Sequence, residues 1–172
     1  VFVGVKPRAL VRLMDKYPEI RARNLTTSDV CHTILKPLTT PAGWVDRATC
    51  TNPEQSWYRH EYHREGLPEQ LQSEPPPGTC SYADILLKDP ELSGLVGFPT
   101  VFWSHPWKDR FADVVTAMDE QYPEEFVWFD CAVLDEHASQ NFSQDWWSIT
   151  FKDAIQTIGH TVMRLSPWDD PH

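Results

Sequence analysis

Residues 100–104 read Thr-Val-Phe-Trp-Ser, a run of β-branched and aromatic side chains that is typical of a buried strand. Two similar runs follow, Phe-Val-Trp-Phe-Asp at 126–130 and Thr-Val-Met-Arg-Leu at 161–165. Between these runs, apolar residues recur at helical spacing over 108–120 and 145–158. The order strand–helix–strand–helix–strand predicts an α/β fold, with a parallel sheet and helices on both of its faces.

The part of the chain before this region has a different character. Three short helices are predicted in it, over residues 9–17, 27–36 and 81–88. Thr27 or Ser28 would cap the second helix, and Pro37 would stop it. Residues 37–79 are rich in proline and are expected to be irregular. We therefore predict a helical and Pro-rich extension at 1–97, followed by an α/β domain at 98–172.

Charge and composition exclude several classes of protein. The chain has 15 basic and 25 acidic residues, a formal net charge of −10, which argues against a nucleic-acid or anionic membrane surface as partner. No run approaches the roughly 18 apolar residues of a membrane-spanning helix. The four cysteines form no Cys-x-x-Cys pair, which favours free thiols and a cytoplasmic location. Because the chain begins without Met and ends just after an apolar run, we expect a fragment of a longer protein.

Polar residues follow each of the predicted strands. Open parallel sheets bind ligands beyond the carboxyl ends of their strands, and here that edge carries Ser104 and His105, then Asp130, then Ser166. Their hydroxyl, imidazole and carboxylate groups suit hydrogen bonds to a ribose or a phosphate. As alternatives, Ser104 caps the following helix, His105 packs in the turn, and Asp130 binds backbone amides of the polar loop 131–144.

Two groups of residues have side chains of the kind that bind metals. One lies in the loop after the second strand: Asp135, Glu136 and His137. The other would hold a structural zinc ion in the N-terminal part: Cys50, His60, His63 and Cys80. The first group has no fixed partner, which favours a solvated loop, and the second matches no common zinc-finger spacing. We therefore expect no metal.

Several segments together resemble a known family. Phe102-Trp103-Ser104-His105 is similar to the first conserved box of Toll/interleukin-1 receptor (TIR) domains, where a strand ends in Phe-x-Ser followed by Tyr, His or another aromatic residue. Further similarities follow in the family's order: the second strand at Phe126–Asp130, the variable BB loop at Cys131–Gln144, the second helix at Phe151–Ile155 and the third strand at Thr161–Pro167. Ser104-His105-Pro106-Trp107 and the Ser-Pro-Trp-Asp-Asp-Pro run at 166–171 resemble the "SHAW" box and the ending of a eukaryotic variant. The resemblance covers residues 98–170.

The resemblance implies an incomplete flavodoxin-like, TIR-like sheet, of which the chain holds the first three strands and two helices. It also implies an intracellular signalling module that binds a nicotinamide dinucleotide such as NAD, or that self-assembles through TIR–TIR contacts. The residues that we expect to bind this ligand are Ser104, His105, Trp107, Asp130 and Ser166.

The resemblance assigns no catalytic residue to this chain. In the NAD-cleaving members of the family, the catalytic Glu lies on the helix after the third strand, and no residue here matches it. NAD⁺ nucleosidase activity is therefore an expectation for a full-length parent only. The alternative is a non-catalytic protein–protein interaction domain.

Overall fold

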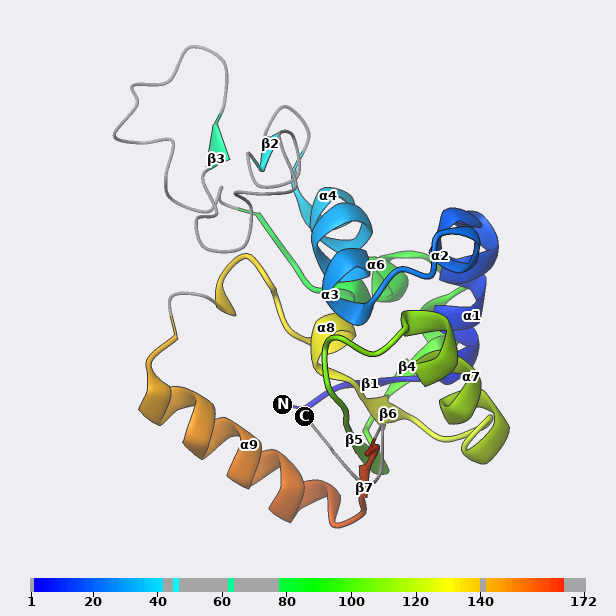
Figure 1. The fold of residues 1–172 in the computed structure, drawn as a ribbon. Coiled ribbons are helices and arrows are strands. Elements are labelled where there is room, and N and C mark those ends of the chain that lie inside the picture. Colours follow the sequence, from blue (N-terminus) through cyan, green and yellow to red (C-terminus); the bar gives the residue numbers. More distant parts are fainter. Residues whose placement is uncertain (1, 42–44, 47–61, 64–77, 140–141, 166–172) are drawn as a thin grey trace.

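The computed structural model describes residues 2–41, 45–46, 62–63, 78–139 and 142–165. A five-stranded mixed sheet in the order β4-β1-β6-β5-β7 forms its centre (Figure 1). Its strands are β1 (Gly4–Val5), β4 (Val96–Gly97), β5 (Val101–Ser104), β6 (Val127–Trp128) and β7 (Thr161–Met163). β5 pairs in parallel with β6 on one side and β7 on the other, whereas β1 pairs antiparallel with β4 and β6.

The three strands and two helices predicted after residue 98 are confirmed. The helices are α7 (Phe111–Gln121) and α9 (Gln144–Ile158), and Gly159 ends α9 in the left-handed conformation at φ 76°. Phe102 of β5 contacts Phe151 of α9, while its neighbour Trp103 contacts Tyr122 at the end of α7. Because successive residues of a strand point to opposite faces, α9 and α7 cover opposite faces of the parallel strands.

The expectation of a wholly parallel sheet is wrong. β1 lies between β4 and β6, with Gly4 opposite Gly97 and Val5 opposite both Val96 and Val127. Two strands of the sheet therefore come from residues 1–97, which we expected to be a helical and irregular extension. A strand of two residues has no alternation that a sequence pattern can reveal. The division at residue 98 stays a prediction, but the sheet crosses it.

Helices from the N-terminal part join the same hydrophobic core. α1 (Pro7–Lys16) packs against α7 and buries Leu10, Leu13 and Met14. The remaining elements are α2 (Glu19–Ala22), α3 (Thr27–Val30), the π-helical turn η1 (Cys31–Leu35), α4 (Lys36–Thr39), α6 (Tyr82–Lys88), the 3₁₀ turn η3 (Ser93–Leu95), α8 (Asp130–Val133) and the two strands β2 (Val45–Asp46) and β3 (Tyr62–His63).

The helical segment after residue 26 departs from its prediction at both ends. Thr26 is the N-cap rather than Thr27 or Ser28, and it forms a reciprocal capping box with Asp29. The segment also continues through Pro37 to the end of α4. Proline has no backbone N–H, so Pro37 cannot donate a hydrogen bond within the helix. Just before it, the amide of Lys36 donates to the carbonyl of Cys31, five residues earlier, and this bond makes the turn π-helical.

The start of α3 lies over the loop that follows β5. The amides of Thr27 and Ser28 donate to the carbonyls of Asp109 (2.9 Å) and Trp107 (3.0 Å). The amide of Phe111 donates in turn to the carbonyl of Leu25 at 2.9 Å. This N-terminal segment thereby positions the loop at the carboxyl end of β5.

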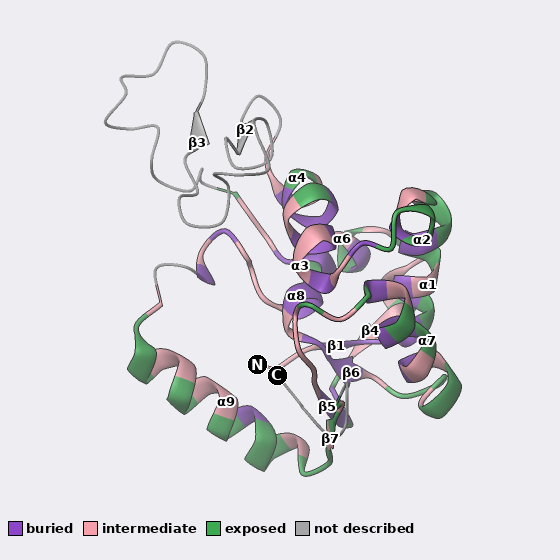
Figure 2. Ribbon diagram, viewed as in Figure 1, coloured by how far each residue is buried: buried purple, intermediate pink, exposed green. Residues whose placement is uncertain are grey.

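Helix α9 is the most exposed long helix (Figure 2). Ala154 alone on it is buried, and Ile149 and Ile155 are 60% and 41% exposed. Among the described helices, none is both long enough and apolar enough to cross a bilayer.

Candidate functional site

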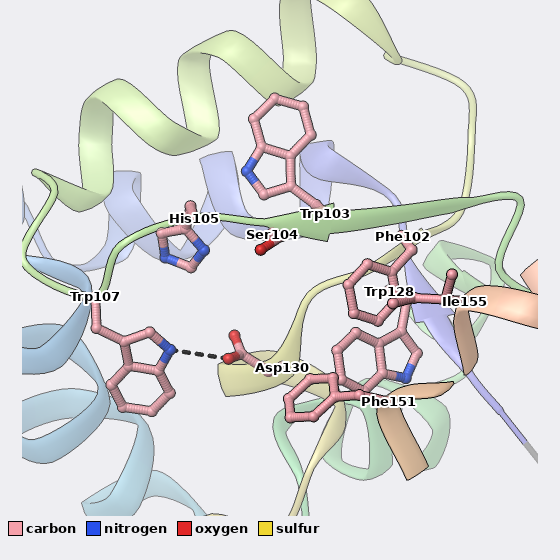
Figure 3. A pocket seen from close by; sticks show the side chains of 9 residues that line it. All are labelled: Phe102, Trp103, Ser104, His105, Trp107, Trp128, Asp130, Phe151 and Ile155. Atoms are coloured by element: carbon pink, nitrogen blue, oxygen red, sulfur yellow. Dashed lines mark hydrogen bonds between the residues drawn. The ribbon is translucent and has the colours of Figure 1, made fainter. Parts of the chain in front are cut away.

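A pocket of about 370 Å³ lies at the carboxyl ends of β5 and β6, beside α9 (Figure 3). Four of the five residues proposed from the sequence line it: Ser104, His105, Trp107 and Asp130. The fifth, Ser166, lies outside the described residues. The structure therefore brings together side chains from the ends of two neighbouring strands, at the edge where open α/β sheets bind ligands.

Three aromatic rings form one wall of the pocket. Phe102 and Trp128 stack with their ring centroids 4.7 Å apart and their planes 9° from parallel. Phe151 of α9 meets both rings edge-on, at 6.0 and 5.5 Å, and Ile155 from the next turn of α9 also lines the pocket. Such a wall offers an apolar surface to a planar ring.

From the sequence, Phe102 and Trp128 are predicted in strands and Phe151 on an apolar helix face, and none of them is assigned to the site. The signal that reveals two of them is the two-residue period of a strand. Phe102 shares a face with Ser104, and Trp128 shares one with Asp130. No comparable signal relates Phe151 to the strands, because α9 contacts them only through the tertiary fold.

The carboxylate of Asp130 is held from two sides. The indole Nε1–H of Trp107 donates to Oδ2 at 2.8 Å, and the backbone N–H of Cys131 donates to Oδ1 at 2.8 Å. The second bond confirms the expectation that Asp130 binds an amide of the following segment, which forms α8 rather than a loop at this point. Each carboxylate oxygen has a second lone pair, so the group keeps capacity to accept from a ligand hydroxyl.

The hydroxyl of Ser104 does not cap the following helix. α7 begins at Phe111, and its N-cap position is occupied by Arg110. The Ser104 hydroxyl points into the pocket and makes no hydrogen bond with any residue that the structure describes (Figure 3). It is therefore free to donate to or accept from a bound molecule.

The imidazole of His105 packs in the turn, as the alternative interpretation predicted. Its Nε2 lies 3.0 Å from the hydroxyl of Thr27, and its ring centroid lies 4.9 Å from that of Phe129. Burial lowers the pKa of His105 from its ordinary value, partly opposed by the nearby carboxylates of Asp130 and Asp109. The imidazole is thus neutral at pH 7 and presents one donor and one acceptor.

A cation lies close to this edge of the sheet. Arg164 follows β7, and its amide donates to the carbonyl of Ser104 at 2.8 Å. Its guanidinium Nε pairs with Oδ2 of Asp109 at 3.0 Å, and the Asp109 side chain is only 9% exposed. The ion pair joins the loop after β5 to the end of β7 and fixes both beside the pocket.

The acidic segment after α8 binds its own surroundings. Asp135 accepts from Thr79 and from the amide of His137, and Nε2 of His137 lies 2.8 Å from the hydroxyl of Thr39. Burial raises the pKa of Glu136 to about 8, and the charge of Asp130 adds to this effect. The segment is thus packed against α4, and it is not the solvated loop that we expected.

No metal site is found in the described part of the chain. Within it, no three His, Cys, Asp or Glu side chains are grouped so as to hold an ion. Of the zinc candidates from the sequence, Cys50 and His60 lie outside the described residues, and His63 is described only by its backbone in β3. Cys80 is a free thiol.

The arrangement combines an aromatic wall with a fixed carboxylate, a free hydroxyl and a neutral imidazole, a set that suits a planar ring joined to a hydroxylated sugar.

Comparison of the chain with protein-family models, with curated proteins and with solved structures finds no match.

Proposed function

We propose that this protein is a TIR-like signalling module and that the pocket at the carboxyl ends of β5 and β6 binds a nicotinamide dinucleotide. The observation that carries the proposal is the meeting of Ser104 and Asp130 with the ring wall of Phe102, Trp128 and Phe151 in one pocket. A carboxylate at a strand end is a usual acceptor for ribose hydroxyls, and aromatic rings stack on bases.

The topology of the parallel strands supports the same proposal. The first of the three, β5, lies between the second, β6, and the third, β7. This is the 2-1-3 start of flavodoxin-like sheets, in which ligands bind beyond the carboxyl ends of the strands, the edge at which the pocket lies. The flavodoxin-like and TIR-like identity of the fold is part of the proposal, and the signalling role and cytoplasmic location are carried by the family resemblance.

In the proposed complex, each side chain has one role. The nicotinamide ring packs against Phe151 and Trp128, and the ribose hydroxyls donate to the carboxylate of Asp130. The hydroxyl of Ser104 binds the same sugar, and His105 supports the turn that carries Trp107. The proposal concerns binding and assigns no catalytic residue to this chain.

Isothermal titration calorimetry with NAD⁺ tests the proposal. Asp130→Asn should weaken binding roughly 10-fold, because it removes a charged acceptor worth about 1.5–3 kcal/mol per hydrogen bond. Phe151→Ala should weaken it by a similar factor through loss of a stacking surface. Asp153→Asn and Ile149→Ala change exposed residues of α9 outside the pocket and should leave binding within about twofold. If millimolar NAD⁺ gives no binding heat, or if the pocket variants bind like the controls, the proposal is wrong.

A second candidate is a non-catalytic domain that assembles with its own kind. β7 is an edge strand of the described sheet, and Met163 on it is 65% exposed. Leu165, just beyond it, is 49% exposed. Exposed apolar edge strands pair readily with another chain. Light scattering over a range of concentrations should then show association that Met163→Lys abolishes; a monomer at all concentrations would exclude this candidate.

A further inference from the structure

Trp107 lies between two cavities. It lines the pocket described above, and it also lines a second cavity of about 450 Å³ that opens beside the start of α3. The second cavity is otherwise lined by Thr26, Ser28, Asp29 and Lys108. Among the described residues, Trp107 alone is common to the two linings. Trp107 therefore lies between the cavity at the sheet and the cavity at α3.

The position of Trp107 is set by two contacts. The indole Nε1–H donates to Asp130 at 2.8 Å, which fixes the ring on the sheet side (Figure 3). The backbone carbonyl of Trp107 accepts from the amide of Ser28 at 3.0 Å, which fixes the residue against α3. Trp107 is half-buried, so part of the side chain stays accessible to a bound molecule.

The second cavity has the chemistry of a nucleoside phosphate site. Trp107 lines it, and an indole ring is a surface on which a base can stack. Asp29 uses Oδ2 in its bonds to Thr26, at 2.9 and 2.7 Å, and its Oδ1 remains as an acceptor for a sugar hydroxyl. Lys108 is exposed at the edge and supplies a positive charge for a phosphate.

Neither cavity alone is large for a dinucleotide. Ligand pockets span roughly 300–1,000 Å³, and 370 Å³ is near the lower limit. A molecule with two ring systems joined by a pyrophosphate has one part for each cavity and an anionic connection between them. Trp107 lines both cavities, and its chain neighbour Lys108 lines the second.

We propose that a dinucleotide lies across Trp107, with one nucleoside in each cavity and its pyrophosphate next to Lys108. Trp107 is then the residue that distinguishes a dinucleotide from a mononucleotide, because the second nucleoside makes a contact with it that a mononucleotide in the first cavity does not make. This inference rests on the proposed function and adds the second half of the site to it.

The test compares NAD⁺ with nicotinamide mononucleotide on the intact chain by calorimetry. The wild type should bind NAD⁺ roughly 10-fold or more tightly than the mononucleotide, in line with the stacking of one base on an aromatic ring. Trp107→Ala should reduce this ratio to about twofold, whereas Trp107→Phe, which keeps a ring, should retain most of it. The ratio corrects for any change that the lost bond to Asp130 causes in the first cavity.

Lys108→Ala is a second, independent variant at an exposed position. It should weaken NAD⁺ binding severalfold, while Lys16→Ala, which removes the same charge from the exposed end of α1, should leave binding within about twofold. Circular dichroism checks that each variant is folded.

Three results would overturn the inference. If both ligands bind the wild type equally, or if the ratio survives in Trp107→Ala, or if Lys108→Ala binds NAD⁺ as Lys16→Ala does, the dinucleotide does not cross Trp107, although the first pocket still binds it. If neither ligand binds, the proposed function fails as well.

Discussion

Gly4 offers a direct test of the most unexpected feature of the fold, the insertion of β1 into the sheet. Gly4 lies opposite Gly97 in the β1–β4 pair. In Gly4→Ala, the new Cβ would lie 2.9 Å from Cβ of Pro99 and 3.1 Å from both Cα of Pro99 and the carbonyl carbon of Phe126. Two of these three are backbone atoms, which cannot rotate away, so the strands themselves must move apart.

The expected cost follows from this crowding. Inserting a methyl group into a well-packed site typically costs about 1–3 kcal/mol. For a chain of this size, 1 kcal/mol lowers the melting temperature by roughly 2–4 °C. Gly94→Ala is the matched control, because a Cβ there meets no atom within 4 Å. It should change the free energy of unfolding by less than about 0.5 kcal/mol.

Urea unfolding followed by tryptophan fluorescence measures both variants under identical conditions. The slope of the free energy against urea should be unchanged, since the same surface is exposed on unfolding. If Gly4→Ala is as stable as Gly94→Ala to within about 0.5 kcal/mol, residues 4 and 5 do not pack in the sheet, and the reasoning about its mixed topology fails.

Three further predictions concern charged groups. Arg164→Gln should cost about 1–3 kcal/mol in urea unfolding, because it leaves the Asp109 carboxylate, 9% exposed, without its ion pair; Arg21→Gln breaks a pair whose side chains are 48% and 64% exposed and should cost under about 0.5 kcal/mol. Because the pKa of His105 is lowered in the folded state, the free energy of unfolding should fall as the pH drops through and below about 6.5. His105→Asn should flatten this part of the stability profile. If the wild type and His105→Asn lose stability equally in this range, the prediction is wrong. The pKa of Glu136 is raised from 4.5 to about 8, so the free energy of unfolding should fall by on the order of a few kcal/mol as the pH rises between these values. Glu136→Gln should remove this fall. A wild-type profile that does not decline over this range would argue against a buried carboxyl group.

The parallel half of the fold follows from local patterns. β5, β6 and β7 are runs of β-branched and aromatic residues, and α7 and α9 show regular apolar spacing. From strand polarity alone, Ser104, His105 and Asp130 could be placed at one edge of the sheet, and Trp107 followed from the TIR resemblance.

The antiparallel half could not be found in this way. β1 and β4 are two residues each, and their pairing joins positions more than ninety residues apart, as in Gly4 with Gly97. The path of the helix through Pro37 depends on a π turn, and no local pattern indicated it. These features depend on which distant backbone groups are available as partners, so a window of sequence does not contain them.

The sequence by itself determined which residues form the central strands and where each strand ends, because side-chain periodicity and strand polarity are local properties. Only the tertiary structure decided that Phe151 completes the aromatic wall, that the indole of Trp107 binds Asp130, and that residues at the start of α3 line a second cavity together with Trp107. Each of these contacts joins elements distant in sequence, and the energy that forms them comes from burying the core that the elements share.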